Sequence, residues 1–383
     1  MFLQIHYDLE GFFAFVVILS RIFLRTFSCQ CGNNLHFANT HCVKCGLKVG
    51  FLPDERQLSA LTNAVNGELL ASNNGKLYRP CKNYKVYDVC NWMVEQKDTN
   101  ELCVSCRLTE TTPNLDEPEN IKLWYLLEQA KRRFLYSAMN LNLPITNKVE
   151  DPTNGLGFDF LQNQTVDSYG NELFIKNYVT TGHSNGLITL NINEAKDASR
   201  IDMREKMNEK YRTLIGHFRH ESGHYYWDRL ILNSDRLEEF REIFGDERLD
   251  YQTAMANYYA NGPAQIWQEV WISAYASMHP WEDWAETWAH YLHMVDTLET
   301  ANDFSLSISH KNIMTPYLKG DERSELAVET SFTQLFDDWC ALTQVLNALN
   351  RSMGMDDAYP FVISLSALKK LRFVHHTILD HLN

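Results

Sequence analysis

The chain has 383 residues, of which 45% are hydrophobic, 12% aromatic and 22% charged, and this composition excludes wholesale disorder and a polytopic membrane protein. Its 35 Lys and Arg against 49 Asp and Glu give a net charge of -14. That balance argues against non-specific binding to nucleic acid, whose phosphates are neutralised by clustered basic residues. Of the nine cysteines, only Cys340 lies beyond residue 107, so cysteine usage itself divides the chain.

The amino-terminal region contains an apolar run, GFFAFVVILS at residues 11–20, which is followed at once by arginine. A membrane-spanning helix needs about 20 apolar residues, and this run has about half that number. A secretory signal begins with basic residues, whereas Asp8 and Glu10 precede this run. We therefore expect residues 1–25 to be a non-essential extension, with a membrane anchor or signal over residues 11–24 as the alternative.

The first four cysteines form two close pairs, each followed by Gly, in the string CQCGNNLHFANTHCVKCG. A tight turn that points two thiolates at one ion is typical of a zinc knuckle. The next four are spaced more widely, and only their last pair has the knuckle spacing. Four thiolates leave no open coordination position, so we predict two structural zinc sites with the cysteines grouped in sequence order. The first group is Cys29, Cys31, Cys42 and Cys45, and the second is Cys81, Cys90, Cys103 and Cys106.

Disulfides are the alternative use of these cysteines, since an even number is compatible with a secreted protein. Close CxC and CxxC pairs in a chain of this size favour zinc over structural bridges. Reduced zinc-thiolate sites suit the cytosol, and we therefore expect a cytoplasmic protein.

The string LTETTPNLDEPEN, which follows the last of these cysteines, predicts a domain boundary because it is rich in Thr, Pro and Asn. We assign a cysteine-rich zinc-ribbon module to residues 26–112 and a second domain to residues 113–383. Apolar residues at helical spacing predict a helix over residues 121–140. Alternation predicts a strand over residues 187–192, and one long helix is expected over residues 199–232.

The predicted long helix contains the motif His-Glu-Ser-Gly-His at residues 220–224. Residues four apart lie on one helical face, so His220 and His224 can both reach one metal ion. Glu221 then points beside the ion, toward bound water, where its carboxylate is placed to act as a base. The motif by itself is suggestive rather than decisive, and the apolar residues before it indicate a helix packed inside a domain.

Catalytic zinc usually has three protein ligands and keeps the fourth position for water or substrate. A histidine six residues after the second motif histidine is absent, because position 230 is Leu. Further along the chain, Glu282, Glu286 and His290 fall four residues apart, on one face of another predicted helix. These residues are candidates for the third ligand.

Several segments resemble the zinc-binding metallopeptidases of bacteria that carry an amino-terminal zinc ribbon. The resemblance runs from about residue 26 to the end, and it implies an α+β protein in which the ribbon precedes a mostly helical, zincin-like metallopeptidase domain. The segments that carry it are FSCQCGNNLHFANTHCVKCG, LCVSCRLTETTPNL, YRTLIGHFRHESGHYYWDRLI, FREIFGDERLDY and HPWEDWAETWAHYLHMVDTLETA.

The segment YASMHPWEDWAE is similar to part of anthrax lethal factor, a gluzincin. The similarity implies that Glu282 is the third zinc ligand, that Glu286 supports the ligands from behind, and that Tyr275 is a hydroxyl on the oxyanion side. The intervening residues His279 and Pro280 differ from that pattern, so Glu286 stays open as the alternative ligand.

These features predict a metallopeptidase with one catalytic zinc, in which Glu221 takes a proton from water and returns it to the leaving amine. The expected partner is a peptide or protein substrate. Residues 187–192 are a candidate edge strand for pairing with an extended peptide, or alternatively an internal core strand. A catalytically silent, zinc-stabilised protein-binding module is the alternative function, and the intact Glu221 favours the enzyme.

Other polar residues near the motif have simpler interpretations. His217, His290 and His293 are expected to be packing or supporting histidines rather than ligands, and Asp228 a solvated charge rather than a partner for a histidine. We expect the aromatic residues 225–227 to belong to the core. The acidic and basic residues at 246–248 predict a salt-bridge corner or a loop.

Overall fold

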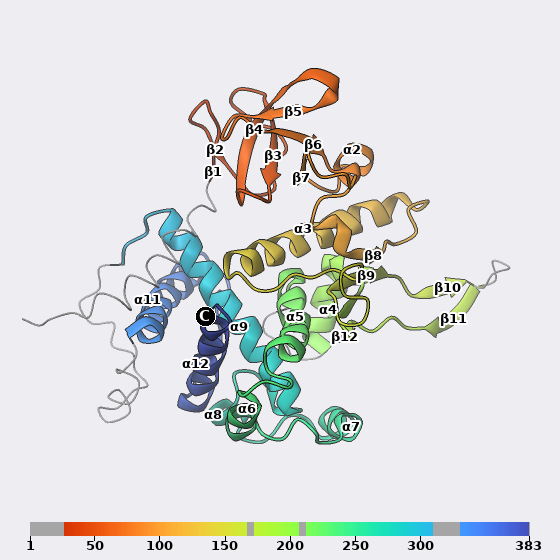
Figure 1. Cartoon of the computed structure of the whole chain (residues 1–383). Helices are drawn as coiled ribbons and strands as arrows, with labels where there is room; N and C mark the ends of the chain where they lie inside the picture. Colours follow the sequence, from red (N-terminus) through yellow and green to blue (C-terminus); the bar gives the residue numbers. More distant parts are fainter. Residues whose placement is uncertain (1–26, 167–171, 207–211, 309–329, 383) are drawn as a thin grey trace, which may run out of the picture.

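The computed structural model describes residues 27–166, 172–206, 212–308 and 330–382. A β-rich part sits on a long helix, and a mostly helical part with a second sheet lies on the other side of that helix (Figure 1). The predicted α+β organisation is thus confirmed. The expected amino-terminal extension lies outside the described residues. In the described part of the chain, no helix is long and apolar enough to cross a membrane.

The β-rich part is built on an antiparallel sheet in which each strand pairs with the next along the chain. Its core is aromatic: the rings of Phe51 and Trp92 lie 4.6 Å apart, and both side chains are fully buried. The elements are β1 (Phe27–Ser28), β2 (Asn34–Leu35), β3 (Lys48–Leu52), β4 (Gln57–Asn63), η1 (Val65–Gly67), β5 (Leu69–Ala71), β6 (Leu77–Pro80), α2 (Lys82–Tyr87), β7 (Met93–Glu95) and η2 (Cys106–Leu108).

Helix α3 (Pro118–Asn140) joins the two parts and matches the predicted helix. Pro at the first helical turn suits its start, where a backbone N–H has no helical partner. The apolar residues that predicted it are buried: Leu123, Leu127, Ala130 and Phe134.

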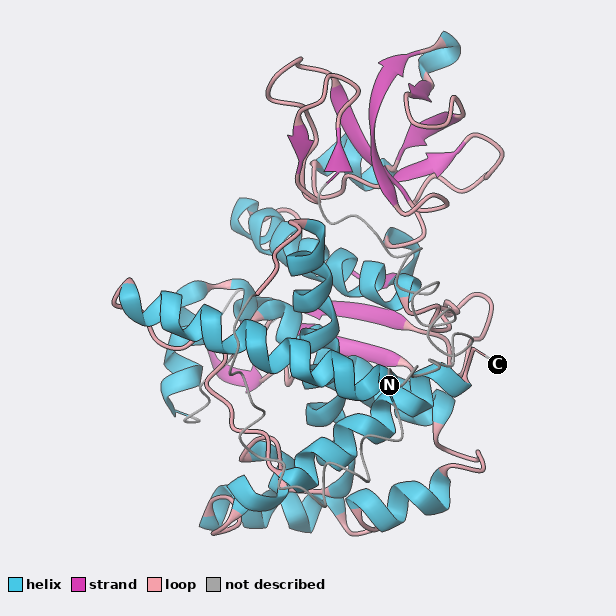
Figure 2. Ribbon diagram, turned by 90° about the vertical axis from the view of Figure 1, so that its left-hand side faces the viewer, coloured by secondary structure: helices cyan, strands magenta, loops and turns pink. Residues whose placement is uncertain are grey.

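The second sheet has the order β12, β13, β9, β8. Strands are seen among the helices of the mostly helical part in Figure 2. The predicted strand is β13 (Leu187–Asn191), which pairs on both sides, so the alternative of an internal core strand is confirmed and that of an edge strand was wrong. Alternation of side chains shows which residues of a strand are buried, here Ile188 and Leu190. It does not show which strands pair with it. The strands are β8 (Thr109–Thr111), β9 (Gly157–Leu161), β12 (Gly182–Ser184) and β13, with a separate hairpin of β10 (Gln164–Val166) and β11 (Glu172–Asn177). Strand β8 already pairs with β9 of the second sheet. The chain therefore leaves the sheet of the ribbon module before residue 112, where we placed the end of that module.

The single helix expected over residues 199–232 was also wrong. Thr213 has extended backbone, and its hydroxyl accepts a hydrogen bond from Gly216 N at 3.0 Å, so a new helix begins at Leu214. The helical elements after β13 are η3 (Ile192–Ala195), α4 (Asp197–Lys206), α5 (Leu214–Leu230), α6 (Leu237–Phe244), α7 (Tyr251–Asn261), α8 (Trp267–Val270), η4 (Tyr275–Ser277), α9 (Pro280–Asp303), α11 (Thr330–Ser352) and α12 (Leu365–Asp380).

Helices α5 and α9 cross closely at Gly223. A Cβ atom at this position would lie 2.8 Å from the Cα atom of Ala285, so only glycine fits. Two indole N–H groups fasten the crossing: Trp284 donates to Gly223 O at 2.8 Å, and Trp288 donates to the Ser222 hydroxyl at 3.2 Å.

The Gly223→Ala substitution should lower the free energy of unfolding by about 1–3 kcal/mol, because the added methyl group forces the two helices apart. Denaturant unfolding measures this change. Gly182→Ala is the control, since a Cβ atom there meets nothing within 4 Å, and it should change stability by less than about 0.5 kcal/mol. Equal effects of the two substitutions would contradict the packing argument.

Candidate active site and metal centres

The crossing of α5 and α9 brings together His220, His224 and Glu282, whose ligand atoms all lie within 4.8 Å of one another. The Nε2 atom of His220 is 3.0 Å from one carboxylate oxygen of Glu282, and that of His224 is 3.4 Å from the other. Ligand atoms about 2.0–2.1 Å from a tetrahedral zinc lie about 3.3 Å apart, so this donor set fits zinc. Oxygen Oε2 of Glu282 is buried and, although it lies 3.0 Å from His220 Nε2, it has no well-formed hydrogen bond to any described residue, so it is open to a metal.

Glu286 lies one turn further along α9 and contacts the other ring nitrogen of His220. Its Oε1 atom is 2.6 Å from His220 Nδ1, and its Oε2 atom accepts a hydrogen bond from the Ser273 hydroxyl at 2.6 Å. A carboxylate in this place fixes the ring orientation of a metal-binding histidine and leaves Nε2 free to bind. The structure thus places Glu282 with the two histidines and Glu286 behind one of them.

Electrostatics at this centre favour a cation. Burial alone lowers the pKa of His220, but Glu282 and Glu286 outweigh it and raise that pKa well above its usual range. A metal ion would supply this positive charge in place of the proton, which is how metal binding and ligand protonation are linked.

Glu221 is 7% exposed and follows His220 on α5. Burial raises the pKa of its carboxyl group, while the neighbouring histidines oppose that rise. A carboxylate with a raised pKa is a better proton acceptor near neutral pH than an ordinary one.

Two tyrosines lie next to the ligand residues of the centre. The ring of Tyr275, in η4, is 5.9 Å from that of His220, and burial raises the pKa of its hydroxyl. Tyr251, the first residue of α7, donates a hydrogen bond from its hydroxyl to Glu282 Oε1 at 2.8 Å. Tyr251 could not be predicted from the sequence, because no motif or spacing connects it to the ligands.

His183 was also missed. It lies on β12, and its ring stacks on that of His224 at 6.3 Å, while Trp281 packs on the same histidine at 3.9 Å. Only the pairing of β12 with β13 brings His183 to the centre, so the sequence offered no signal for it.

The remaining polar candidates lie elsewhere. The Nε2 atom of His217 is 3.1 Å from Glu194, and His290 Nδ1 is 2.6 Å from the Tyr359 hydroxyl. His293 packs against Trp339 and Tyr359. Among the described residues Asp228 has no hydrogen bond to a histidine, and burial raises its pKa to about 6. The aromatic residues 225–227 are buried as predicted, and the expected corner consists of an Arg241–Glu247 pair at 2.6 Å and an Arg248–Asp246 pair at 2.8 Å.

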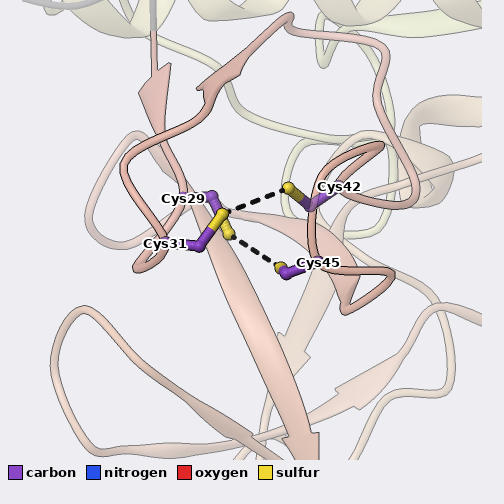
Figure 3. A group of neighbouring side chains, drawn as sticks. All are labelled: Cys29, Cys31, Cys42 and Cys45. Carbon is purple, nitrogen blue, oxygen red and sulfur yellow. Dashed lines mark hydrogen bonds between the residues drawn. The ribbon is translucent and has the colours of Figure 1, made fainter.

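The first cysteine group lies on loops of the ribbon module (Figure 3). The Sγ atoms of Cys29 and Cys45, and those of Cys31 and Cys42, are each 3.6 Å apart. Thiolates about 2.3 Å from a tetrahedral zinc lie about 3.8 Å apart, so this group fits the ion. One of its members, Cys45, is exposed to solvent.

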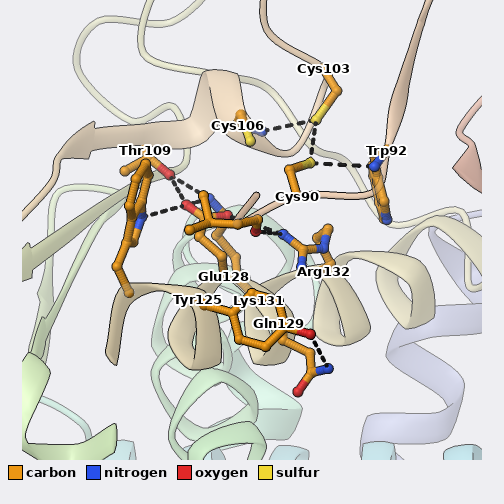
Figure 4. Close-up of polar contacts among 12 residues, drawn as sticks. Cys90, Trp92, Cys103, Cys106, Thr109, Tyr125, Glu128, Gln129, Lys131 and Arg132 are labelled. Carbon is orange, nitrogen blue, oxygen red and sulfur yellow. Dashed lines mark hydrogen bonds and ion pairs between the residues drawn. The ribbon is translucent and has the colours of Figure 1, made fainter. Parts of the chain in front are cut away.

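All four cysteines of the second group are buried, and three of them, Cys90, Cys103 and Cys106, are drawn in Figure 4. The Sγ atoms of Cys90 and Cys103 are 3.7 Å apart, and the backbone N–H of Trp92 points at the Cys90 sulfur at 3.4 Å. The structure thus gathers the eight thiols in the two sequential groups.

Arg132 of α3 reaches the second group from the other domain. Its guanidinium is buried and donates to Val89 O at 2.7 Å, next to Cys90. Although burial lowers the pKa of Arg132, the neighbouring thiols and Glu128 raise it above its ordinary value. Zinc with four thiolates carries a charge of about -2, and a buried arginine is a suitable counter-charge.

Comparison with known proteins agrees with this geometry. Residues 120–377 match the family described as "Putative zinc-binding metallo-peptidase", and residues 26–117 match a zinc-ribbon domain. The chain therefore belongs to this metallopeptidase family, which confirms the resemblance found in the sequence.

Similar relatives include the uncharacterized protein Mb2598c of Mycobacterium bovis and the uncharacterized protein Rv2568c of Mycobacterium tuberculosis. Each is 39% identical over 359 residues, which cover 93% of this chain and 96% of the relative. No solved structure matches the chain.

A chelator should remove zinc from the first cysteine group before the second, because solvent reaches Cys45 whereas all four thiols of the second group are buried.

The Arg132→Met substitution should speed the release of zinc from the second group by about tenfold, since it leaves the negative site uncompensated. A chromogenic chelator measures release, and alkylation of the freed thiols assigns each phase.

The matched control for this prediction is Lys44→Met. Lys44 is an exposed cation whose Nζ atom is 3.3 Å from Cys31 O, beside the first group. Solvent already screens its charge, so release from the first group should change less than about twofold. An unchanged rate at the second group in Arg132→Met would contradict the charge argument.

Proposed function

We propose that the protein is a zinc-dependent peptidase that hydrolyses peptide bonds, with one catalytic zinc held by His220, His224 and Glu282 and two structural zincs in the ribbon module. The observation that carries the proposal is the geometry of the three ligand atoms, together with Glu221, which lies on the same helix as His220 and His224. Zinc bound there would lower the pKa of its water and polarise the substrate carbonyl.

The residues of the chain supply the proton transfers. Glu221, buried beside the ligands, takes a proton from water as the carbonyl is attacked and then gives it to the leaving amine. Tyr275 donates a hydrogen bond to the developing oxyanion, an interaction that is worth a few kcal/mol when the donor is preorganised. Glu286 holds the ring of His220 in the orientation that binding requires.

The outer strand β12 is the candidate for substrate pairing, in place of β13. It is terminal in the order of its sheet, and the ring of His183 within it stacks on that of His224, so an edge strand lies next to the centre. An extended peptide adds to such an edge through backbone hydrogen bonds.

The second candidate function is a silent binding module in which zinc only stabilises the fold. Glu221 favours the enzyme, because a scaffold needs no buried carboxylate beside the ligands. We expect no nucleic-acid partner, given the net charge of -14. Cysteine groups suited to zinc are consistent with a cytoplasmic protein.

The Glu221→Gln substitution should abolish cleavage while leaving metal content unchanged at about three zinc per chain, since Glu221 is not a ligand. Metal analysis and turnover of a broad peptide library, for wild type and variant, provide the measurement. Full activity of the variant would overturn the mechanism. Wild-type protein that holds zinc but cleaves no peptide would support the silent module.

Glu282→Gln should lose the third zinc, whereas Glu286→Gln should keep it and weaken its binding by about 10- to 100-fold, because Glu286 acts through His220. Competition with a fluorescent zinc indicator measures both affinities. The reverse order of effects would make Glu286 the ligand.

A further inference from the structure

The segment between the two ligand-bearing helices has an unusual composition. Residues 251–268 contain no Asp, Glu, Lys, Arg or His, in a chain in which 22% of residues are charged. This segment forms α7 and the connection to α8, and none of the residues of α7 is buried. A helix at the surface normally carries charged residues, so α7 differs from most in offering no ionic partner to a group that lies against it.

One face of α7 is turned toward the candidate centre. Tyr251, Ala254, Met255 and Tyr258 are half-buried, whereas all the other residues of the helix are exposed, and this spacing defines a single helical face. We call these four residues the inner face of α7. The helix itself lies at the lower edge of the molecule in Figure 1.

Both ends of the inner face touch the centre. The Tyr251 hydroxyl donates to Glu282 Oε1 at 2.8 Å, and the ring of Tyr258 lies 5.6 Å from that of Tyr275, edge to face. Ala254 and Met255 lie between these two contacts, on the same side of the helix. The inner face is therefore continuous with the site at which a peptide bond would be held.

We propose that the inner face of α7 is one wall of the substrate site and that it receives an uncharged, apolar side chain of the peptide, next to the bond that is cut. This inference rests on the proposed function and names its substrate class. A tyrosine ring offers apolar surface, and methionine adapts to side chains of different shape. A charged side chain would lose water here without gaining an ionic partner, because the segment offers none.

The charge preference can be tested with two alanines of the same helix. Ala254→Lys places a cation on the inner face, whereas Ala256→Lys places one on the exposed side. Wild-type protein should prefer peptides with apolar residues beside the cut. Ala254→Lys should shift kcat/KM for acidic relative to apolar peptides by about tenfold, and Ala256→Lys should keep the wild-type profile.

Two results would overturn the proposal: a wild-type preference for a charged residue beside the cut, or identical profiles for the two lysine variants. Thermal unfolding of all three proteins shows whether the variants are folded. If a second copy of the chain covers α7 instead, sedimentation would show a wild-type dimer that Ala254→Lys dissociates without any change in profile, and this also overturns the proposal.

Failure of the proposed function gives a different pattern. If wild-type protein cleaves none of the library, the peptidase proposal fails. Binding of the same peptides to the zinc-loaded Glu221→Gln protein still tests whether the inner face of α7 contacts an apolar side chain of the peptide. Ala254→Lys in that background should bind acidic peptides about tenfold better relative to apolar ones, with Ala256→Lys as control. Equal relative binding by the two variants would overturn the inference about α7 alone.

Discussion

The close approach of α5 and α9 is the constraint on which the candidate centre depends. Helix α5 supplies His220, His224 and the buried Glu221, and α9 supplies Glu282. These side chains are short, so they meet at 3.0–3.4 Å only because Gly223 lets the two backbones touch at Ala285. The glycine inside the motif is thus a packing residue. Its neighbour Ser222 accepts the hydrogen bond from Trp288 at the crossing, and its neighbour His224 belongs to the candidate metal centre.

Helix α3 holds this pair of helices in relation to the ribbon module. On one side, the Ser137 hydroxyl donates to Asp296 of α9 at 2.6 Å, and the same carboxylate pairs with Arg219, the residue before His220. On another side, Arg132 donates a hydrogen bond to Val89 O, next to Cys90 of the second cysteine group. The two domains therefore share one helix, and the buried arginine makes the charge of the second cysteine group part of the domain interface.

The sequence predicts those parts of the site that lie within one helix. Helical periodicity places His220 and His224 on one face, and Glu282 four residues before Glu286, without any tertiary information. Knuckle spacing similarly predicts the cysteine groups. Tyr251 and His183 escape prediction because long-range packing and strand pairing bring them in, and neither leaves a local pattern. The edge alternative for residues 187–192 was wrong for the same reason, and the single helix expected over residues 199–232 was wrong because Thr213 caps a new helix that begins at Leu214.

The distribution of buried charge shows why the centre calls for a cation. Elsewhere in the core buried cations lie beside carboxylates: Lys131 pairs with Glu128 at 2.9 Å, and Lys370 pairs with Asp283 at 2.6 Å. At the centre three carboxylates, those of Glu221, Glu282 and Glu286, surround two histidines, and in the described part of the chain no Lys or Arg pairs with any of them. Neutral histidines cannot balance three carboxylates in a dry site, so protons or a dication must do so. Protons on the histidines or a bound dication can both supply this charge, and the three ligand atoms, which all lie within 4.8 Å of one another, match the requirements of a dication.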